Sequence, residues 1–320
     1  MRLLNQKIKF LFFGRKGIFF TFAAIALALI LILSSNVYKV YEMRGNVDVI
    51  ATRVITMNNF IKDVEDDLEK GLLIASSRAF LSMVQYISNN GTYITNLEDS
   101  FNELILNGKL YSSEPSLMKD STFTDWINKI EIQANKIDIL LNFTIINVEI
   151  NQTDPWHVSV NSLINFTLID KKNTSKWVRN KEIITLVGIE NFEDPLYAVK
   201  TSGRVINAMI KAPTTDFVNG NNLDNLLSHI NNSYYIESES APNFLMRLEG
   251  NLLNSSTGIE SLVNLQELLD QGVAIKDRSA VDYIYFGTQI TINHRINQTP
   301  PWFKLDDAHL ATYEVENMAI

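Results

Sequence analysis

The feature that most restricts how this 320-residue chain can fold is an uncharged apolar run from Ile18 to Leu33. Thr21 is its only polar residue, and a basic leader comes directly before it. As a helix the run spans about 24 Å, and continuing it to Val37 brings it to the thickness of a ~30 Å hydrocarbon core. A buried helix of a soluble protein is the alternative, and the lack of any polar face disfavours it. We therefore predict a transmembrane helix over 18–37.

The charge distribution predicts the orientation of this helix. Residues 1–17 hold five of the 28 basic residues and no acid, which leaves 23 basic against 36 acidic residues in 18–320. Basic residues beside a span favour the cytoplasmic side, so we expect a cytoplasmic leader over 1–17 and an extracellular C-terminal domain, with a single pass through the cell membrane. An acidic domain does not suit binding to nucleic acid, so no nucleic-acid partner is expected. The apolar helix makes the lipid bilayer the expected partner. The chain has no cysteine, which excludes disulfides and cysteine nucleophiles.

The string GRKG at residues 14–17, followed at once by the apolar run, resembles the class III signal peptide of archaeal type IV pilin-like proteins. The resemblance implies a cut on the cytoplasmic side after Gly17, with Arg15, Lys16, Gly17 and Ile18 as the processing residues. One departure is Phe22, the fifth residue of the processed chain, where bacterial pilins have a glutamate. The stretch LSSNVYKV after the run contains no small-x-small site, so we expect the helix to be retained. The resemblance also implies partners: copies of this chain or other pilin-like subunits.

An amphipathic pattern continues beyond the apolar run. Apolar residues recur there with alternating spacings of three and four, the heptad pattern of helices that pack along a seam. These seam residues are Val40, Met43, Val47, Ile50, Val54, Met57, Ile61, Val64 and Leu68. We predict a long helix that breaks at Gly71, then a second helix ended by Asn89-Asn90-Gly91. The seam packs either on other copies of the chain or on this protein's own outer domain, and the acidic stretch DVEDDLE (63–69) is interpreted as a solvated face rather than a metal site.

The predicted fold class is α+β: a long N-terminal helix, transmembrane and then amphipathic, with an antiparallel β-rich outer domain. Residues 38–113 are assigned to the extended helix and a second helix, and 114–197 to a helix followed by three β-rich segments. Short turn sequences between these segments predict an antiparallel meander with a helix on one face. Residues 198–320 are assigned to a second α+β part, with a turn at Asn219-Gly220 and a helix near 222–231.

No stretch of the chain matches a catalytic motif. GxSxG, the phosphate loop and the dinucleotide fingerprint are absent, and no two histidines have the spacing of a zinc-binding helix. LDDAHL (305–310) is interpreted as a capped surface turn, and the aromatic clusters at 234–235, 283–286 and 301–303 as packing rather than binding platforms. We therefore predict no enzymatic activity, no catalytic residue, no metal and no cofactor.

Asn-x-Ser/Thr sequons occur along the part of the chain that is predicted to be extracellular. Asn151, Asn173 and Asn254 fall in predicted loops and are the candidate glycosylation sites, whereas Asn142 and Asn165 fall in strand-like runs and are expected to be less accessible. The segments FEDPLYAV, FLMRLEG, GIESLVNLQEL and SAVDYIYF are similar to stretches of archaeal surface proteins that begin with a pilin-like signal. This second resemblance implies location and architecture rather than chemistry.

Together these features predict a membrane-anchored, pilin-like surface glycoprotein that acts by assembly into filaments or by adhesion. Two alternatives of different kinds remain. The first is a single-pass ectodomain that binds a ligand or partner without polymerising. The second is an anchored exoenzyme whose catalytic residues come together only in the folded chain, since a Ser–His–Asp triad has no fixed order in sequence.

Overall fold

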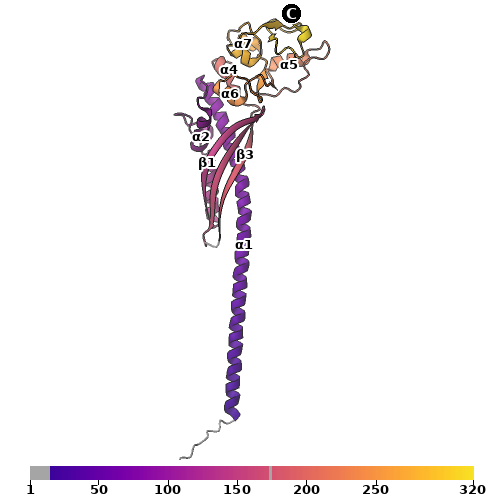
Figure 1. Ribbon diagram of the computed structural model, residues 1–320. Helices are drawn as coiled ribbons and strands as arrows, with labels where there is room; N and C mark the ends of the chain where they lie inside the picture. The colour runs from indigo at the N-terminus through magenta and orange to yellow at the C-terminus, as the bar shows by residue number, and fades with distance from the viewer. Residues whose placement is uncertain (1–14, 173–174) are drawn as a thin grey trace, which may run out of the picture. The chain divides into compact units, whose positions relative to one another are not determined.

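The computed structural model describes residues 15–172 and 175–320. The chain divides into two compact units, Met1–Asp63 and Val64–Ile320. One helix, α1 (Arg15–Asn90), contains the described residues of the first unit and continues into the second. The structure is mixed helix and antiparallel sheet, which confirms the predicted fold class (Figure 1).

The first unit carries the apolar segment. Residues Phe19–Tyr41 of α1 have a mean hydropathy of 2.2, and none of them is buried. Their helical length is about 35 Å, so this segment is long and apolar enough to cross a membrane. The prediction of an N-terminal apolar helix is confirmed, and the segment begins one residue later and ends four residues later than the predicted 18–37.

The break predicted at Gly71 is wrong, because α1 runs unbroken to Asn90. A Cβ atom added at Gly71 would lie 2.4 Å from Cδ1 of Trp126, so the glycine gives the indole room against the helix. Glycine costs a helix about 1 kcal/mol relative to alanine, and the close packing of the indole offsets that cost here. The predicted end of the helix is confirmed, since Gly91 follows Asn90 with a left-handed φ of 66°.

Two helices follow α1 and pack in the second unit. In α2 (Leu97–Asn107), the Phe101 ring stacks on Phe80 of α1 with centroids 4.7 Å apart. The helix predicted over 114–137 begins later, as α3 (Phe123–Lys136), after a short 3-10 turn, η1 (Ser116–Met118). Its start is set by a capping box in which Thr122 and Asp125 each bond the other's backbone N–H.

A three-stranded antiparallel sheet confirms the predicted meander. The strands pair in the order β1-β2-β3, and they are β1 (Ile139–Asp154), β2 (His157–Asp170) and β3 (Lys176–Gly188). The inner face of the sheet buries alternate residues of β2 from Val158 to Leu168. The sheet lies beside the part of α1 that follows Asp63, where Lys181 Nζ of β3 is 2.9 Å from Glu65 Oε2 (Figure 1).

The C-terminal residues form short elements around one hydrophobic core. Its members come from the segments between Leu196 and Val315, and they include the aromatic residues Tyr283, Tyr285, Phe286 and Phe303, which supports the packing interpretation of those clusters. The turn predicted at 219–220 is confirmed by an Asn219–Asn222 bridge. The elements are α4 (Pro195–Lys200), α5 (Asp224–Asn232), β4 (Tyr235–Glu237), α6 (Phe244–Glu249), β5 (Ile259–Ser261), α7 (Leu265–Asp270), α8 (Asp282–Phe286), β6 (Asn293–Arg295), β7 (Lys304–Asp306) and η2 (Glu316–Met318).

The sheet is tied to this C-terminal core at one end. Trp156, in the turn between β1 and β2, donates its indole N–H to Glu237 of β4 at 2.8 Å. Gln152 of β1 accepts from the backbone N–H of Leu245 in α6 at 3.3 Å. These bonds connect segments more than 80 residues apart, so the sheet and the C-terminal elements belong to one unit.

Candidate functional site

The strongest concentration of buried charge in the described residues lies around Arg247. This residue is in α6, which begins at the N-cap Asn243 and ends at Gly250 with a left-handed φ of 71°. The ring of Tyr93 lies against Gly250, where a Cβ atom would be 2.5 Å from its Cδ2. The helix is therefore fixed at both ends, and the Arg247 side chain points into the interior with no exposed area.

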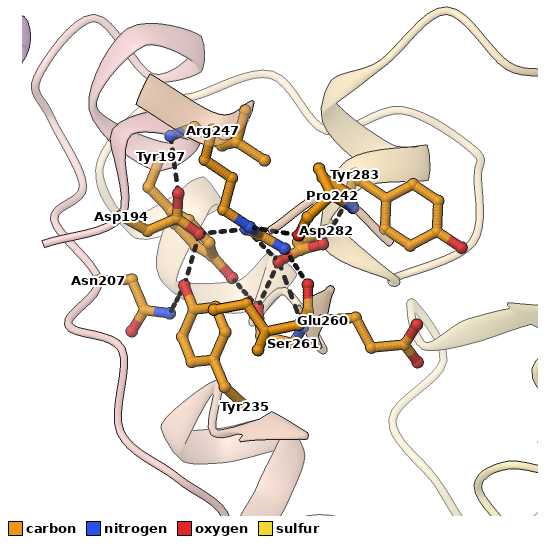
Figure 2. Close-up of polar contacts among 12 residues, drawn as sticks. Asp194, Tyr197, Asn207, Tyr235, Pro242, Arg247, Glu260, Ser261, Asp282 and Tyr283 are labelled. Carbon is orange, nitrogen blue, oxygen red and sulfur yellow. Dashed lines mark hydrogen bonds and ion pairs between the residues drawn. The ribbon is translucent and has the colours of Figure 1, made fainter. Parts of the chain in front are cut away.

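The guanidinium of Arg247 connects two acidic residues and two backbone carbonyls (Figure 2). Its Nη1 is 2.5 Å from Oδ2 of Asp194 and 2.9 Å from Oδ2 of Asp282. Its Nε donates to the carbonyl of Pro242 at 3.3 Å, and its Nη2 donates to the carbonyl of Ile259. All three of its nitrogens therefore have partners, as a buried guanidinium requires.

The two acidic partners of Arg247 each lie at the start of a helix. Asp194 is the N-cap of α4 and accepts from the backbone N–H of Leu196 at 2.8 Å. Asp282 opens α8 and accepts from both the backbone N–H and the hydroxyl of Ser261, each at 3.2 Å. The Tyr235 hydroxyl donates to Asp194 at 2.7 Å. The cluster thus joins α4, α6 and α8 to the two-stranded β4-β5 sheet.

The electrostatics of this cluster follow from the burial of its charged side chains. Burial raises the pKa of Asp282 to about 6, and the positive charge of Arg247 opposes the shift. Burial and the nearby carboxylate of Asp194 raise the pKa of Tyr235 well above its ordinary value, so its hydroxyl stays a donor. One guanidinium faces two carboxyl groups, and hydrogen bonds from Tyr235 and Ser261 stabilise the excess negative charge.

A second buried cluster lies around His309. Its Nδ1 is 2.7 Å from Oδ1 of Asp306, and its Nε2 is 3.3 Å from Oε2 of Glu260. Burial opposes a charge on the ring, but hydrogen bonds and the charges of Asp306 and Glu260 outweigh it and raise the pKa of His309 to about 10. The Tyr313 hydroxyl donates to the other oxygen of Glu260 at 2.9 Å. LDDAHL does form a turn capped by Asp306, as predicted, and Asp307 and Ala308 are exposed. Asp306 and His309 instead point inward and form a buried ion pair that the local sequence does not reveal.

The geometry of both clusters suits structure rather than chemistry on a substrate. The side chains of Arg247, Asp194, Asp282 and Glu260 have no exposed area, and that of His309 is 5% exposed. A substrate that approaches from solvent cannot touch these groups in this conformation. Among the described residues, no group of three or more His, Cys, Asp or Glu is placed to hold a metal ion.

The predicted seam residues separate into two groups along α1. Val40, Met43, Val47, Ile50 and Val54 are exposed, whereas Met57, Ile61, Val64 and Leu68 are buried. Within the acidic stretch, Glu65 forms ion pairs with Arg179 at 3.4 Å and Lys181 at 2.9 Å of β3. Glu65 therefore packs against the sheet, whereas the other acids of the stretch are exposed, as predicted: Asp63, Asp66, Asp67 and Glu69.

The predicted processing and glycosylation residues are placed as follows. Arg15, Lys16, Gly17 and Ile18 begin α1, and their side chains lie outside the described part of the chain. Asn173 also lies outside the described residues. Asn254 is exposed in a loop, as predicted. Asn151 is exposed but belongs to β1, so its assignment to a loop is wrong: the strand continues to Asp154 through pairing with β2.

Sequence reasoning did not find the Arg247 cluster. A signal was nevertheless present for two of its charged groups, because Arg247 in FLMRLEG and Asp282 in SAVDYIYF each stand between apolar or aromatic neighbours, whereas Asp194 in FEDPLYAV follows another acid, Glu193. An isolated charge in an apolar segment needs a partner if that segment is buried. Which charges pair could not be read from the sequence, since Arg247 lies 53 residues from Asp194 and 35 from Asp282.

Comparison of the chain with family models, curated proteins and solved structures finds no match.

Proposed function

We propose that this protein is a single-pass surface protein that acts by assembly or adhesion and not by catalysis. In this proposal residues 1–17 stay in the cytoplasm, the Phe19–Tyr41 segment crosses the cell membrane and the Val64–Ile320 unit is extracellular. The apolar length of α1 and the basic residues that precede it support the anchor and its orientation. The burial of the charged clusters supports a structural role for the unit that carries them.

The observation that carries the assembly proposal is an exposed apolar stripe on α1 beyond the membrane-length segment. Val47, Ile50 and Val54 are 63%, 45% and 37% exposed, and all three come after Tyr41, where the apolar segment ends. Lipid tails cover apolar side chains within the hydrocarbon core but not beyond it. The stripe has the heptad spacing of coiled-coil seams, and parallel copies held in one membrane present it at the same height. We therefore assign this stripe to packing between copies of the chain.

Disulfide cross-linking tests the assembly proposal directly, because the chain has no cysteine of its own. Val54→Cys places a thiol on the seam, and Thr52→Cys places one two residues away on the opposite side of the helix. Both positions are exposed, so the pair is matched. Mild oxidation in native membranes is expected to convert Val54→Cys, but not Thr52→Cys, into a covalent dimer on non-reducing gels.

Equal cross-linking of the two variants would indicate random collision and contradict the seam. Absence of cross-linking at Val54, with the protein still at the surface, would favour the ectodomain that binds a ligand without polymerising.

A polar groove of about 260 Å³ favours this alternative function, a ligand-binding ectodomain. It lies in the second unit between the end of α1 and residues 113–116, and its lining includes Gln85, Asn89 and Glu114.

The processing step suggested by GRKG has a separate test. Mass spectrometry of the mature N-terminus is expected to find a chain that starts at Ile18. An intact Met1, or a start beyond Ser35, would rule out pilin-type processing. Electron microscopy of surface filaments, in cells with and without the protein, would then show whether assembly produces a filament.

A further inference from the structure

The β1–β3 sheet has one face that is buried and one that is not. Residues of β2 from Val158 to Leu168 alternate between buried and half-exposed, and the register assigns their neighbours on β1 and β3 to the same two faces. We call the second face the outward face. On β1 it presents Asn142, Thr144, Asn147, Glu149 and Asn151, and on β2 and β3 it presents Ser159, Asn161, Asn165, Thr167, Val178, Asn180, Glu182, Ile184 and Leu186.

Three sequons lie on this outward face. They are Asn142-Phe-Thr144, Asn151-Gln-Thr153 and Asn165-Phe-Thr167, and in each the asparagine and threonine point to the same side because strand side chains alternate. The register places Asn142 opposite Thr167 and Thr144 opposite Asn165, so the first and third sequons are direct neighbours. Extended strand structure therefore does not hide these asparagines, contrary to the expectation for Asn142.

Hydrogen bonding distinguishes the asparagines of this face. Those outside sequons are engaged: the amide of Asn147 donates to Glu149 at 2.8 Å, that of Asn161 donates to Glu182 at 2.6 Å, and Asn180 accepts a bond from Asn165. Within the described part of the chain, the side-chain amides of Asn142 and Asn151 make no hydrogen bond, and both residues are exposed. The amide nitrogen is the atom that N-glycosylation modifies.

Exposed apolar residues lie in the same rows across the sheet. Asn142 is paired with Thr167, which is paired with Val178 on the far strand. Asn151 is paired with Ser159, which is paired with Leu186. Val178 and Leu186 are 58% and 54% exposed. Three strands are only about 10 Å across, so a sugar chain attached to either asparagine reaches the apolar residue at the end of its row.

We propose that the outward face of the sheet is a glycan-bearing surface, with oligosaccharide attached to Asn142 and Asn151. The donor is a sugar chain carried on a lipid phosphate. Nδ2 of the asparagine forms a bond to C1 of the first sugar, the bond from C1 to the phosphate oxygen breaks, and the lipid phosphate leaves while the amide loses one proton to a base of the transferase. The inference depends on the proposed function, because the modification requires an exported chain.

The same geometry excludes Asn165 as a glycosylation site. Its Nδ2 donates to Oδ1 of Asn180 at 2.6 Å, and it lies on the central strand, diagonal to Asn142. A glycan at Asn142 fills the space above it, since diagonal neighbours in a sheet are only about 7–8 Å apart. The glycans therefore follow the edge strand β1 and cover the sheet from that side.

Glycopeptide mass spectrometry of the full chain, purified from its own membranes, tests this proposal. Peptides that contain Asn142 and Asn151 are expected to carry added sugar mass, and the peptide that contains Asn165 is expected to be unmodified. Thr144→Ala is expected to remove the sugar from Asn142 without changing that asparagine, while Thr144→Ser retains it. Asn147→Gln, a change on the same strand outside any sequon, is expected to leave the glycan mass unchanged.

Unmodified peptides at both Asn142 and Asn151 would overturn the inference, as would modification of Asn165 in place of Asn142. Labelling of intact cells with a membrane-impermeant amine reagent separates this failure from failure of the proposed function. A chain that is labelled but carries no sugar on β1 would overturn the glycan-bearing face alone. A chain that is neither labelled nor modified would overturn both.

Discussion

Arg247 bonds segments of the C-terminal part that are far apart in sequence. Its guanidinium is the positive charge between Asp194 and Asp282, and both carboxyl groups are fully buried. A buried ion pair is weak evidence for net stability, but removing one partner leaves an uncompensated buried charge. The packing of α4, α6 and α8 against one another therefore depends on the Arg247 side chain.

Arg247→Met is expected to destabilise the protein by ~3–5 kcal/mol, enough to unfold a marginally stable domain. Urea unfolding of the detergent-solubilised chain, followed by circular dichroism, measures the change. Arg204→Met is the control, because the exposed Arg204 bonds only the carbonyl of Gly272 among the hydrogen bonds of its side chain in the described structure. Adding Asp282→Asn to Arg247→Met is expected to recover part of the loss, and a purely additive effect would contradict the charge argument.

His229 and His309 lie in the same core with opposite pKa shifts. Both ring nitrogens of His229 are buried without a hydrogen-bond partner in the described structure, and the ring packs against Phe217 with centroids 5.1 Å apart. Burial lowers the pKa of His229 to about 4, with Glu260 opposing the shift. His309, held by Asp306 and Glu260, has its pKa raised to about 10.

These shifts predict a stability maximum near neutral pH. Below about 6.5 the unfolded chain binds a proton at His229 that the folded chain does not, so stability falls as the pH drops toward 4. The stabilisation from charged His309 is fully present below about 6.5 and is lost as the pH rises toward 10. The free energy of unfolding measured from pH 4 to pH 10 checks both limits.

His229→Phe is expected to flatten the acid side of this profile. At neutral pH it stabilises the protein by ~1 kcal/mol, because it removes two buried nitrogens without partners. The advantage grows by up to ~1.4 kcal/mol for each pH unit below about 6.5, down to pH 4. His157→Phe, at a half-exposed histidine, serves as the control and should retain the acid sensitivity. An unchanged acid side in His229→Phe would contradict the assignment.

Among the helices and strands, α1 shows how a local signal can be overridden by packing. Gly71 predicts a break in a helix, yet the helix continues because the position faces the indole of Trp126. Glycine in a helix marks a break or a close approach, and the residues around it do not distinguish the two. Only the contact with α3, which begins 52 residues later at Phe123, makes the second role visible.

Gly71→Ala is therefore expected to destabilise the protein although alanine favours a helix. The added Cβ would lie 2.4 Å from Cδ1 of Trp126, and the overpacking costs ~1–3 kcal/mol against a gain of ~1 kcal/mol in helix propensity. Thermal unfolding measures the balance. In a Trp126→Leu background the same substitution should become neutral or stabilising. A loss of stability that persists without the indole would contradict the packing argument.

The chain as a whole combines an apolar helix with a polar, folded C-terminal unit. If Phe19–Tyr41 anchors the protein, the full chain is expected to remain in the membrane pellet after an alkaline wash. Leu27→Arg with Ile30→Arg is expected to release much of it, because each charge at the centre of a span costs ~2.5–3.5 kcal/mol. Leu253→Arg with Ile290→Arg changes a leucine and an isoleucine of the second unit that are even more exposed, and it should leave the pellet unaffected. Equal release by both pairs would contradict the anchor.

Much of the fold could be predicted because its signals repeat locally. Side-chain direction repeats every 3.6 residues in a helix and every two in a strand, so the helix and the β-rich segments are visible in the spacing of apolar residues. The end of α1 at Asn90 and the turns of the meander are visible in the Asn- and Gly-containing or polar stretches that follow each segment. The candidate site was not predictable in the same way. The bonds from Arg247 to Asp194 and Asp282 and from His309 to Glu260 join segments that are far apart in sequence.

The amino-acid sequence alone therefore established an apolar helix of membrane length, a heptad stripe that continues from it, and an antiparallel β-rich domain. The folded chain was needed to show which charges pair, why Gly71 does not end the helix, and that Asn142 and Asn151 share one exposed face, with no hydrogen bond from their amides to any described residue. The physical reason is that periodicity is a property of neighbouring residues. Pairing, close approach and exposure depend instead on which distant segments the core brings together.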